Sequence, residues 1–336
     1  MVKIALLGFG NVGRAFTRYL DQQRPREMGR YRISAVADIS GGLLLAGAPD
    51  DVPWLLDRQE QGRMIADCAE RGTLLDVPSY ISALPGAGIS VLVECLPTNP
   101  IDGQPALGLI RSALERGIAV VTVDKGPLVH GFRELAEIAR RHRTRLAYSG
   151  TTGVKPPADL AGCHVLEIRG ILNGTTNFVL SEMQQHDLTF QQALAKAQDQ
   201  GIAEPNPDLD IQGWDTACKI LILANEWMKA GATLADVTRT GIGPETDELI
   251  REARDGGRLV RLLGRARLSE GSVRVSVTPE MVEAESVFHS ISGTAKGAIF
   301  RTREKGEVFA RGVSGREAIA QIILDDINAV SGPVDV

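Results

Sequence analysis

The feature that most constrains the fold of this chain is an apolar segment of strand length that runs directly into a glycine-rich turn. Residues 2–7 are followed by Gly8, Gly10 and Gly13 in the pattern G-F-G-N-V-G, and residues 14–22 can form a helix. A GxGxxG pattern between a strand and a helix is typical of a dinucleotide-binding fold. The structural alternative is a glycine cluster that only caps a helix. The residues expected to bind the cofactor phosphates are Gly8, Gly10, Asn11, Val12 and Gly13.

An acidic residue follows the next strand-like segment. Residues 31–37 are followed directly by Asp38, which lies a little more than twenty residues after the glycines. This is the position at which such folds place the carboxylate that binds a ribose 2′-hydroxyl. The following residues 39–42 contain no arginine that would bind a 2′-phosphate. We therefore expect NAD or NADP as the cofactor, with NAD favoured.

Strand-like and helix-like segments alternate through residues 1–150. Apolar runs at 89–96, 118–123 and 145–148 are separated by helical segments at 104–115 and 132–141. This alternation predicts an α/β fold with a Rossmann-type, doubly wound parallel sheet. Pro97 and Thr98 follow one of these strands and Lys125 follows the next, where open α/β sheets bind ligands. We expect all three residues to bind the cofactor.

The pattern changes after residue 150. Strands are expected at 163–172, 258–268 and 272–278, and near 298–302 and 307–311, followed by a helix over 315–327. This order predicts an α+β domain over 151–311 for catalysis and dimerisation. It also predicts a C-terminal segment, 312–336, that returns to the Rossmann domain, with Gly315 at a loop-to-helix junction suited to the cofactor. The turn at 173–177 is suited to helix capping or to binding a substrate carboxylate.

A short acidic stretch precedes the most apolar helix of the second half. Glu204, Asp208 and Asp210 lie within seven residues together with Pro205 and Pro207. Since proline fixes φ and lacks an N–H, we expect a rigid acidic loop and no helix at this point. A helix is expected to begin at residue 213.

Asp215 and Lys219 lie four residues apart in that helix and therefore share a face. One interpretation is a solvated ion pair, which stabilises a helix by only about 0.3–0.5 kcal/mol. The alternative is a buried lysine, because residues 220–224 are apolar all round the helix. A buried ammonium held by a carboxylate is a candidate proton donor.

Composition excludes several classes of protein. With 336 residues, 43% hydrophobic residues and a net charge of −5, the chain is an ordinary globular protein of about two domains, without the basic surface of a nucleic-acid-binding protein. Its four cysteines and five histidines are scattered without metal-ligand spacing, so no metal site is expected. The apolar N-terminus is too short for a membrane helix and lacks a signal-peptide pattern. We expect a cytoplasmic protein that does not bind membranes.

Four segments, in their order and spacing, resemble homoserine dehydrogenase. They are the glycine turn, VVTVDKGPL around Lys125, GILNGTTNFVL at 170–180 and GIAEPNPDLDIQGWDTACKILILA at 201–224. The resemblance implies reversible reduction of L-aspartate 4-semialdehyde to L-homoserine with NAD(P)H, in the pathway toward threonine, isoleucine and methionine. It also implies a homodimer or homotetramer. The chain looks like a short family member without a C-terminal ACT-type regulatory domain.

The resemblance also implies roles for individual residues. Lys219 matches the proton donor, Lys125 the second catalytic lysine, and Asp215 the acid beside the catalytic lysine. Residues that match the substrate site are Glu204, Asp210, Gly174 and Thr175. An amino-acid aldehyde needs such carboxylates for its ammonium group and a cation that protonates the developing alkoxide.

Three places depart from the family pattern. The turn at 148–157 lacks the usual glutamate of a monovalent-cation site, Asn206 replaces an aspartate, and Asp124 replaces an asparagine. These departures leave two alternatives open. One is a paralogous oxidoreductase that acts on a different amino-acid-derived carbonyl, and the other is a non-catalytic nicotinamide-binding sensor.

Overall fold

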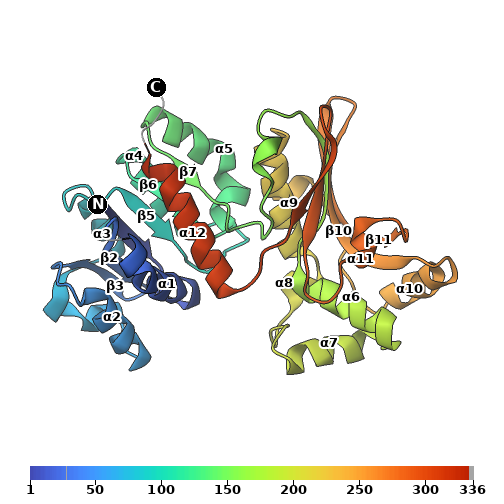
Figure 1. Ribbon diagram of the computed structural model, residues 1–336, viewed down its shortest axis with the longest axis horizontal. Helices are drawn as coiled ribbons and strands as arrows, with labels where there is room; N and C mark the ends of the chain where they lie inside the picture. The colour runs from blue at the N-terminus through green and yellow to red at the C-terminus, as the bar shows by residue number, and fades with distance from the viewer. Residues whose placement is uncertain (28, 333–336) are drawn as a thin grey trace. The chain divides into compact units, whose positions relative to one another are not determined.

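The chain folds into two compact units (Figure 1). The computed structural model describes residues 1–27 and 29–332. One unit contains residues 1–151 and the C-terminal segment from Gly315, and the other contains residues 152–314. Each unit has its own sheet and its own apolar core.

The first unit is built on a seven-stranded sheet with the strand order β4-β3-β2-β1-β5-β6-β7. Its strands are β1 (Val2–Leu7), β2 (Tyr31–Asp38), β3 (Gly41–Leu45), β4 (Gly72–Leu75), β5 (Val91–Glu94), β6 (Ala119–Thr122) and β7 (Leu146–Ala147). Its helices are α1 (Asn11–Glu27), α2 (Asp51–Glu60), α3 (Val77–Ala83), α4 (Ala106–Glu115), α5 (Gly126–Arg141) and α12 (Arg316–Ser331), with short 3-10 turns at Ile65–Asp67 and Ala69–Arg71. The strand order reverses between β1 and β5, which is where sheets of this kind bind ligands.

Alternate residues of the central strands pack on opposite sides of this sheet. In β1, Ile4 and Leu6 contact α1 and α12, whereas Ala5 and Leu7 contact α3 and α4. Figure 1 shows α1 and α12 side by side on one face of the sheet. The C-terminal helix α12 therefore completes the core of the first unit, although 163 residues of the other unit precede it in sequence.

The expected Rossmann-type, doubly wound sheet is confirmed, and two strands at one of its edges are antiparallel. Strands β1, β2, β5, β6 and β7 are parallel, but β3 pairs antiparallel with β2, and β4 antiparallel with β3. Asp38 pairs with Gly41, so Ile39 and Ser40 form a two-residue hairpin turn that reverses the chain. The helix expected over 132–141 also begins earlier, at Gly126, directly after the loop that carries Lys125.

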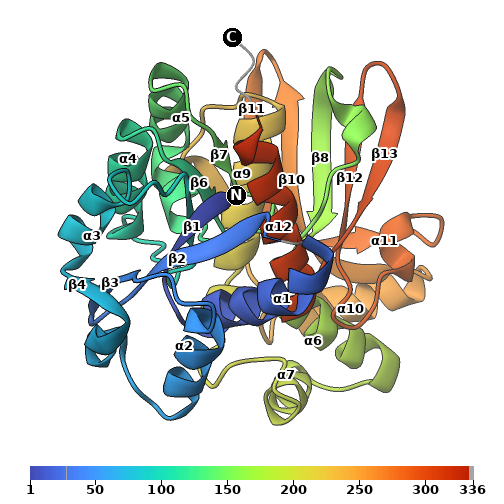
Figure 2. The same cartoon turned by 60° about the vertical axis from the view of Figure 1, so that its left-hand side comes forward.

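The second unit is built on a six-stranded sheet with the order β13-β12-β8-β10-β11-β9. Its strands are β8 (Val165–Ile171), β9 (Val237–Arg239), β10 (Leu259–Ser269), β11 (Ser272–Val282), β12 (Gly297–Thr302) and β13 (Gly306–Arg311). Its helices are α6 (Gly174–His186), α7 (Phe190–Asp199), α8 (Asp208–Ile211), α9 (Trp214–Trp227), α10 (Thr246–Asp255) and α11 (Val287–Ser290), with 3-10 turns at Ala158–Leu160 and Leu234–Asp236. Figure 2 shows β8, β12 and β13 side by side.

The two faces of this sheet differ in character. Helices α6, α9 and α10 cover one face with a large apolar cluster that includes Ile168, Val260 and Phe300. Short helix α11 covers a smaller apolar cluster on the other face. Beyond that cluster, the described side chains include a buried carboxylate, Glu167, with Arg265 at 3.3 Å and Arg301 at 3.2 Å. This face of the sheet therefore combines an apolar cluster with a buried ion-pair group.

The acidic stretch before α9 is not a pure loop, so the expectation that prolines rule out a helix there was wrong. Helix α8 spans Asp208–Ile211 and follows Pro207 as its N-cap residue. The first turn of a helix has no acceptors for its N–H groups, so a proline at its start removes nothing that the turn needs. Within the described residues, no helix is long and apolar enough to cross a membrane.

Candidate functional site

The central polar contact of the second unit is an ion pair within α9. Lys219 Nζ donates to Asp215 Oδ2 at 2.6 Å and to the carbonyl oxygen of Leu172 at 2.9 Å. The exposed fractions of the two side chains are only 11% and 15%. The pair is therefore nearly buried, as in the second of the two interpretations, and is not a solvated surface pair.

Asn173 connects this ion pair to the acidic stretch. Its amide Nδ2 donates to Asp215 Oδ2 at 2.8 Å and to Asp210 Oδ1 at 2.6 Å. Its Oδ1 accepts from the Thr176 N–H at 2.8 Å and so caps the N-terminus of α6. One buried side chain at the end of β8 thus fixes α6, α8 and α9 together.

Asp210 is the second carboxylate of this group. Burial and the neighbouring charge of Asp215 raise the pKa of Asp210, while the nearby Thr175 hydroxyl and the hydrogen bond from Asn173 lower it. With both carboxylates ionised and Lys219 charged, the group has a net charge of −1. Such a site is complementary to a small ligand that carries one ammonium group.

The remaining residues expected to bind substrate lie around this group. Thr175 is buried in the first turn of α6, and its hydroxyl donates to the Ile202 carbonyl at 3.2 Å. Gly174 begins α6, where a Cβ would lie 3.0 Å from the Thr294 carbonyl oxygen. Glu204 is exposed, and within the described part of the chain its carboxylate forms no hydrogen bond or ion pair with this group. Geometry alone therefore places Asp210 in the group and leaves Glu204 beside it.

Sequence reasoning missed the role of Asn173 and of the Leu172 carbonyl. Asn173 stands in the N-G-T-T-N turn that was singled out, directly before the two residues that were expected to bind substrate. Its residue type was a usable signal, because asparagine both caps helices and donates to carboxylates. A backbone carbonyl carries no signal in the sequence.

The glycine turn of the first unit fits a dinucleotide. A Cβ on Gly8 would lie 2.7 Å from the Cys95 carbonyl oxygen, and a Cβ on Gly13 would lie 2.2 Å from the Gly8 carbonyl oxygen. No heavy atom lies within 4 Å of a Cβ built on Gly10, so that side of the turn is open. Helix α1 begins at Asn11 with no acidic residue in its first turn, and the amides of Asn11 and Val12 belong to that turn. Closed packing behind the turn and open space in front of it suit a pyrophosphate.

Asp38 ends β2 and is half-buried. Its Oδ1 accepts from the Ser40 N–H at 2.7 Å and from the Ser40 hydroxyl at 2.5 Å, and its Oδ2 accepts from the Ile65 N–H at 3.0 Å. Each carboxylate oxygen has two lone pairs, so Oδ2 retains capacity for one more donor, as a ribose hydroxyl would provide.

The other residues expected at the cofactor lie after β5 and β6 or before α12. Pro97 is exposed and Thr98 is half-buried, and the Lys125 N–H points to the Thr98 hydroxyl at 3.5 Å. Lys125 is itself half-buried directly before α5. Gly315 precedes α12 with φ of +95° and open space around a built Cβ.

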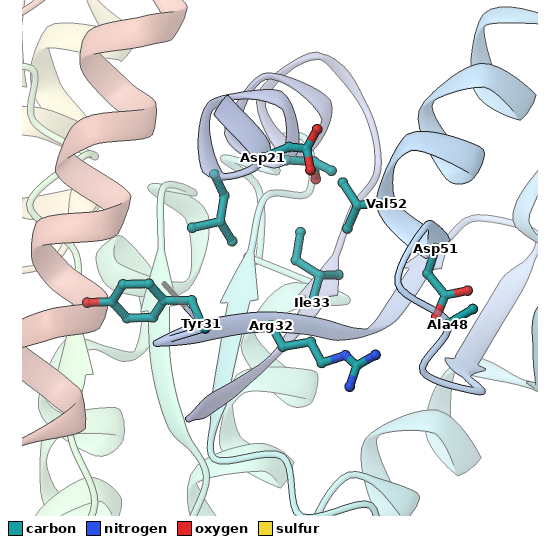
Figure 3. A pocket seen from close by; sticks show the side chains of 10 residues that line it. Asp21, Tyr31, Arg32, Ile33, Ala48, Asp51 and Val52 are labelled. Atoms are coloured by element: carbon teal, nitrogen blue, oxygen red, sulfur yellow. The ribbon is translucent and has the colours of Figure 1, made fainter. Parts of the chain in front are cut away.

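A small cavity of about 40 Å³ in the first unit is not part of these sites. It lies between α1, the start of β2 and the segment before α2 (Figure 3). Tyr31 and Arg32 line it from the amino end of β2, whereas the glycine turn and Asp38 lie at carboxyl ends of strands. Its volume and position do not suit a dinucleotide. Among the described residues, no group of three or more His, Cys, Asp or Glu side chains could hold a metal ion.

Comparisons with known proteins converge on one family. A family model described as homoserine dehydrogenase matches residues 157–327, and one described as homoserine dehydrogenase, NAD binding domain, matches residues 8–149. The chain is 34% identical to the NAD(+)-dependent homoserine dehydrogenase of Pseudomonas canavaninivorans, over 97% of this chain and 95% of that protein. It is 32% identical to the homoserine dehydrogenase of Methanocaldococcus jannaschii, over 97% of each. The crystal structure of a candidate homoserine dehydrogenase from Archaeoglobus fulgidus matches with a TM-score of 0.84 and 31% identity, over 99% of this chain and 100% of that one.

Proposed function

The chain belongs to the homoserine dehydrogenase family, and we propose that it catalyses the reversible, NAD(P)-dependent interconversion of L-homoserine and L-aspartate 4-semialdehyde. The observation that carries the proposal is the group formed by Lys219, Asp215, Asn173 and Asp210. In a nearly buried position it combines the hydrogen-bonded ammonium group of Lys219 with the carboxylates of Asp210 and Asp215. An amino-acid aldehyde requires both kinds of group.

Lys219 is proposed as the proton donor to the carbonyl oxygen in the reducing direction. The Asp215 carboxylate and the Leu172 carbonyl hold its ammonium in one position, so that the third N–H is available for the substrate oxygen. NADH or NADPH, when bound, supplies the hydride for the aldehyde carbon. In the oxidising direction Lys219 accepts the alcohol proton through the same atom.

Asp210 and Glu204 are proposed to bind the substrate ammonium group. Asp210 is already anchored by Asn173, whereas the exposed Glu204 would have to approach the ligand. Gly174 and Thr175 are proposed to position the substrate through the first turn of α6, whose N–H groups and positive dipole suit the substrate carboxylate.

The first unit is proposed as the cofactor domain and the second as the substrate and dimerisation domain. The glycine turn and the start of α1 would hold the pyrophosphate, and Asp38 would accept from the ribose. Asp38 favours NAD, because its charge would repel a 2′-phosphate. Lys125, Pro97, Thr98 and Gly315 are proposed to line the nicotinamide side, with Lys125 as the second catalytic lysine.

We further propose a homodimer or homotetramer that works in the cytoplasm on amino-acid biosynthesis. The oligomer is expected from the family, and light scattering after size exclusion at micromolar concentration checks it. A homogeneous species of about 36 kDa would remove this part of the proposal.

The test of the function is a spectrophotometric assay with L-homoserine and either NAD+ or NADP+. We expect absorbance of the reduced nicotinamide to increase with time, and the Lys219→Ala variant to be the matched inactive control. A panel of related hydroxy amino acids tests the alternative substrate. Turnover of another panel member with none of L-homoserine would replace the proposed substrate, and cofactor binding without any turnover would indicate a sensor.

A further inference from the structure

A carboxyl group is buried behind the glycine turn that is proposed to bind the cofactor. Glu94 ends β5, and its side chain is completely buried. Its Oε1 accepts from the Leu96 N–H at 2.6 Å, which lies in the loop after β5. Its Oε2 is hydrogen-bonded to the Thr122 hydroxyl at the end of β6. Glu94 thus ties together the ends of two neighbouring parallel strands.

The loop that Glu94 holds is in direct contact with the glycine turn. A Cβ built on Gly8 would lie 2.7 Å from the Cys95 carbonyl oxygen and 3.0 Å from the Leu96 nitrogen. The position of the Leu96 peptide therefore sets the position of the Gly8 turn. The peptide that Glu94 holds therefore lies directly against the proposed pyrophosphate site.

The hydrogen-bond chain continues from Thr122 to the loop that carries Lys125. The Asp124 N–H donates to the Thr122 hydroxyl oxygen at 3.0 Å, and Asp124 Oδ1 accepts from the Gly126 N–H at 2.9 Å. These two bonds fix the backbone on both sides of Lys125. One polar chain thus runs from the loop after β5 to the first turn of α5.

Two carboxyl groups cannot both be ionised in this buried place at little cost. Burial, reinforced by the neighbouring Asp124 charge, raises the pKa of Glu94 to about 8, although the hydrogen bonds from Thr122 and Leu96 lower it. Burial also raises the pKa of Asp124, but the Gly126 N–H, Thr98 and the charge of Lys125 lower it. Asp124 has more support for a negative charge than Glu94 has, which favours a neutral Glu94 beside an ionised Asp124.

We propose that Glu94 is a positioning residue for the cofactor site: its carboxyl group ties the loops after β5 and β6 to each other and thereby sets the glycine turn and the Lys125 backbone. This inference rests on the proposed function of the first unit, and it assigns a role to a residue that touches neither cofactor nor substrate. Loss of its proton places a second negative charge beside Asp124, and the repulsion between the two carboxylates displaces the loops that they hold.

The surroundings of Glu94 provide no cation that would stabilise the ionised form directly. The titratable groups around it, within the part of the chain that the structure describes, are Asp124, the buried thiol of Cys95 and, on the far side of Asp124, Lys125. β1, α12 and α4 pack around β5 through apolar side chains such as Leu7, Ile323 and Ile110.

The variants that test this role are chosen for hydrogen bonding. Glu94→Gln keeps one acceptor for Leu96 and one donor for Thr122, but it cannot ionise. Glu94→Leu removes both bonds at similar volume. Thr122→Val removes the central hydroxyl of the chain, and Thr122→Ser is its matched control because it keeps the hydroxyl.

The measurement is the dissociation constant for the oxidised cofactor, by titration calorimetry, between pH 7 and 9.5. For wild type we expect weaker binding above pH 8, approaching tenfold per pH unit and so up to about 30-fold at pH 9.5. Glu94→Gln is expected to stay within about threefold over the same range. Glu94→Leu and Thr122→Val are expected to bind weakly at every pH, and Thr122→Ser to behave like wild type.

A second readout measures the protonation of Glu94 directly, without cofactor and without turnover. Infrared difference spectra of wild type minus Glu94→Gln, without cofactor, should show a protonated carboxyl at pH 7 that disappears near pH 8. An ionised Glu94 at pH 7, or the same pH dependence of binding in wild type and Glu94→Gln, would overturn the proposal. If wild type at pH 7 bound neither NAD+ nor NADP+, the proposed function would fail, and the positioning role would fall with it even if the infrared band were present.

Discussion

Asn173 donates from a single amide nitrogen to both carboxylates of the candidate site, to Asp210 at 2.6 Å and to Asp215 at 2.8 Å. Without this amide the two carboxylates would face each other across a poorly solvated space. The same side chain caps α6 through its other atom, Oδ1. Substrate binding and the local fold therefore depend on the same residue, and their contributions must be separated by experiment.

We expect Asn173→Ala to raise KM for L-homoserine by about tenfold, because loss of hydrogen bonds to charged groups costs about 1.5–3 kcal/mol. It should also lower the free energy of unfolding by about 1–2 kcal/mol through the lost cap. Asn225→Ala is the matched control, because Asn225 makes a comparable pair of bonds to Ala232 elsewhere on α9. Steady-state kinetics and chemical denaturation of both variants check this. An equal KM effect in the control would assign the result to stability alone.

Because the pKa of Asp210 is raised, we predict an acidic limb in the pH profile, over which KM for L-homoserine rises as the pH falls. Substrate ammonium binding needs ionised Asp210, so KM for L-homoserine should rise as the pH falls through this raised pKa, above the range of an ordinary aspartate. Asp210→Asn should raise KM and remove the limb, since an amide does not titrate. Profiles of kcat/KM from pH 4.5 to 8 test this, and an unchanged limb in Asp210→Asn would assign it to another group.

The position of Asp38 predicts a preference for NAD over NADP. Asp38→Asn should lower kcat/KM with NAD+ and narrow the preference by about tenfold or more, because repulsion of the 2′-phosphate is removed. Ser40→Ala is the matched control, since it removes one hydroxyl from Asp38 without changing charge. Values of kcat/KM with NAD+ and with NADP+, measured for wild type and both variants, test this prediction. A wild-type preference for NADP would contradict the assigned ribose contact.

The raised pKa of Glu94 predicts that the free energy of unfolding falls as the pH rises. A carboxyl whose pKa is raised in the folded state contributes stability that is present below the unfolded pKa, about 4.3, and is lost as the pH rises toward about 8. Relative to Glu94→Gln, wild type should therefore lose up to about 1.4 kcal/mol of unfolding free energy per pH unit within this window. Denaturant titrations at pH 5, 6.5 and 8 measure the difference. A constant difference would show that Glu94 has an ordinary pKa.

Several parts of the candidate cofactor and substrate sites could be predicted from sequence, because they depend on local patterns. The G-F-G-N-V-G turn, Asp38 after a strand, and the Asp215 and Lys219 spacing follow from chain geometry over a few residues. The antiparallel β3 and β4 could not be predicted, because the two-residue turn after Asp38 contains no strong hairpin signal. The role of Glu94 was hidden for a different reason, since it depends on a neighbour 28 residues away in sequence.

Within the candidate site, the sequence identified the residue types but not their contacts. Asp210 was placed in an acidic loop, but a one-turn helix after Pro207 presents it to Asn173. Glu204 and Asp210 have the same chemistry and lie in the same stretch, yet only Asp210 is held by the group. Such differences arise from tertiary packing, which short-range patterns do not encode.

The most direct test of the account is the thermal midpoint and kcat of Lys219→Ala, measured on one preparation. We predict a fall in kcat of about 10²–10⁴ with cofactor affinity nearly unchanged, as expected for loss of a general acid. Lys196→Ala is the control, because it removes a lysine from an ion pair with Glu182 away from the site. A midpoint similar to that of the control together with lost turnover would support proton donation by Lys219. A large drop in midpoint with near-normal turnover per folded molecule would contradict it and would reduce Lys219 to the partner that neutralises Asp215.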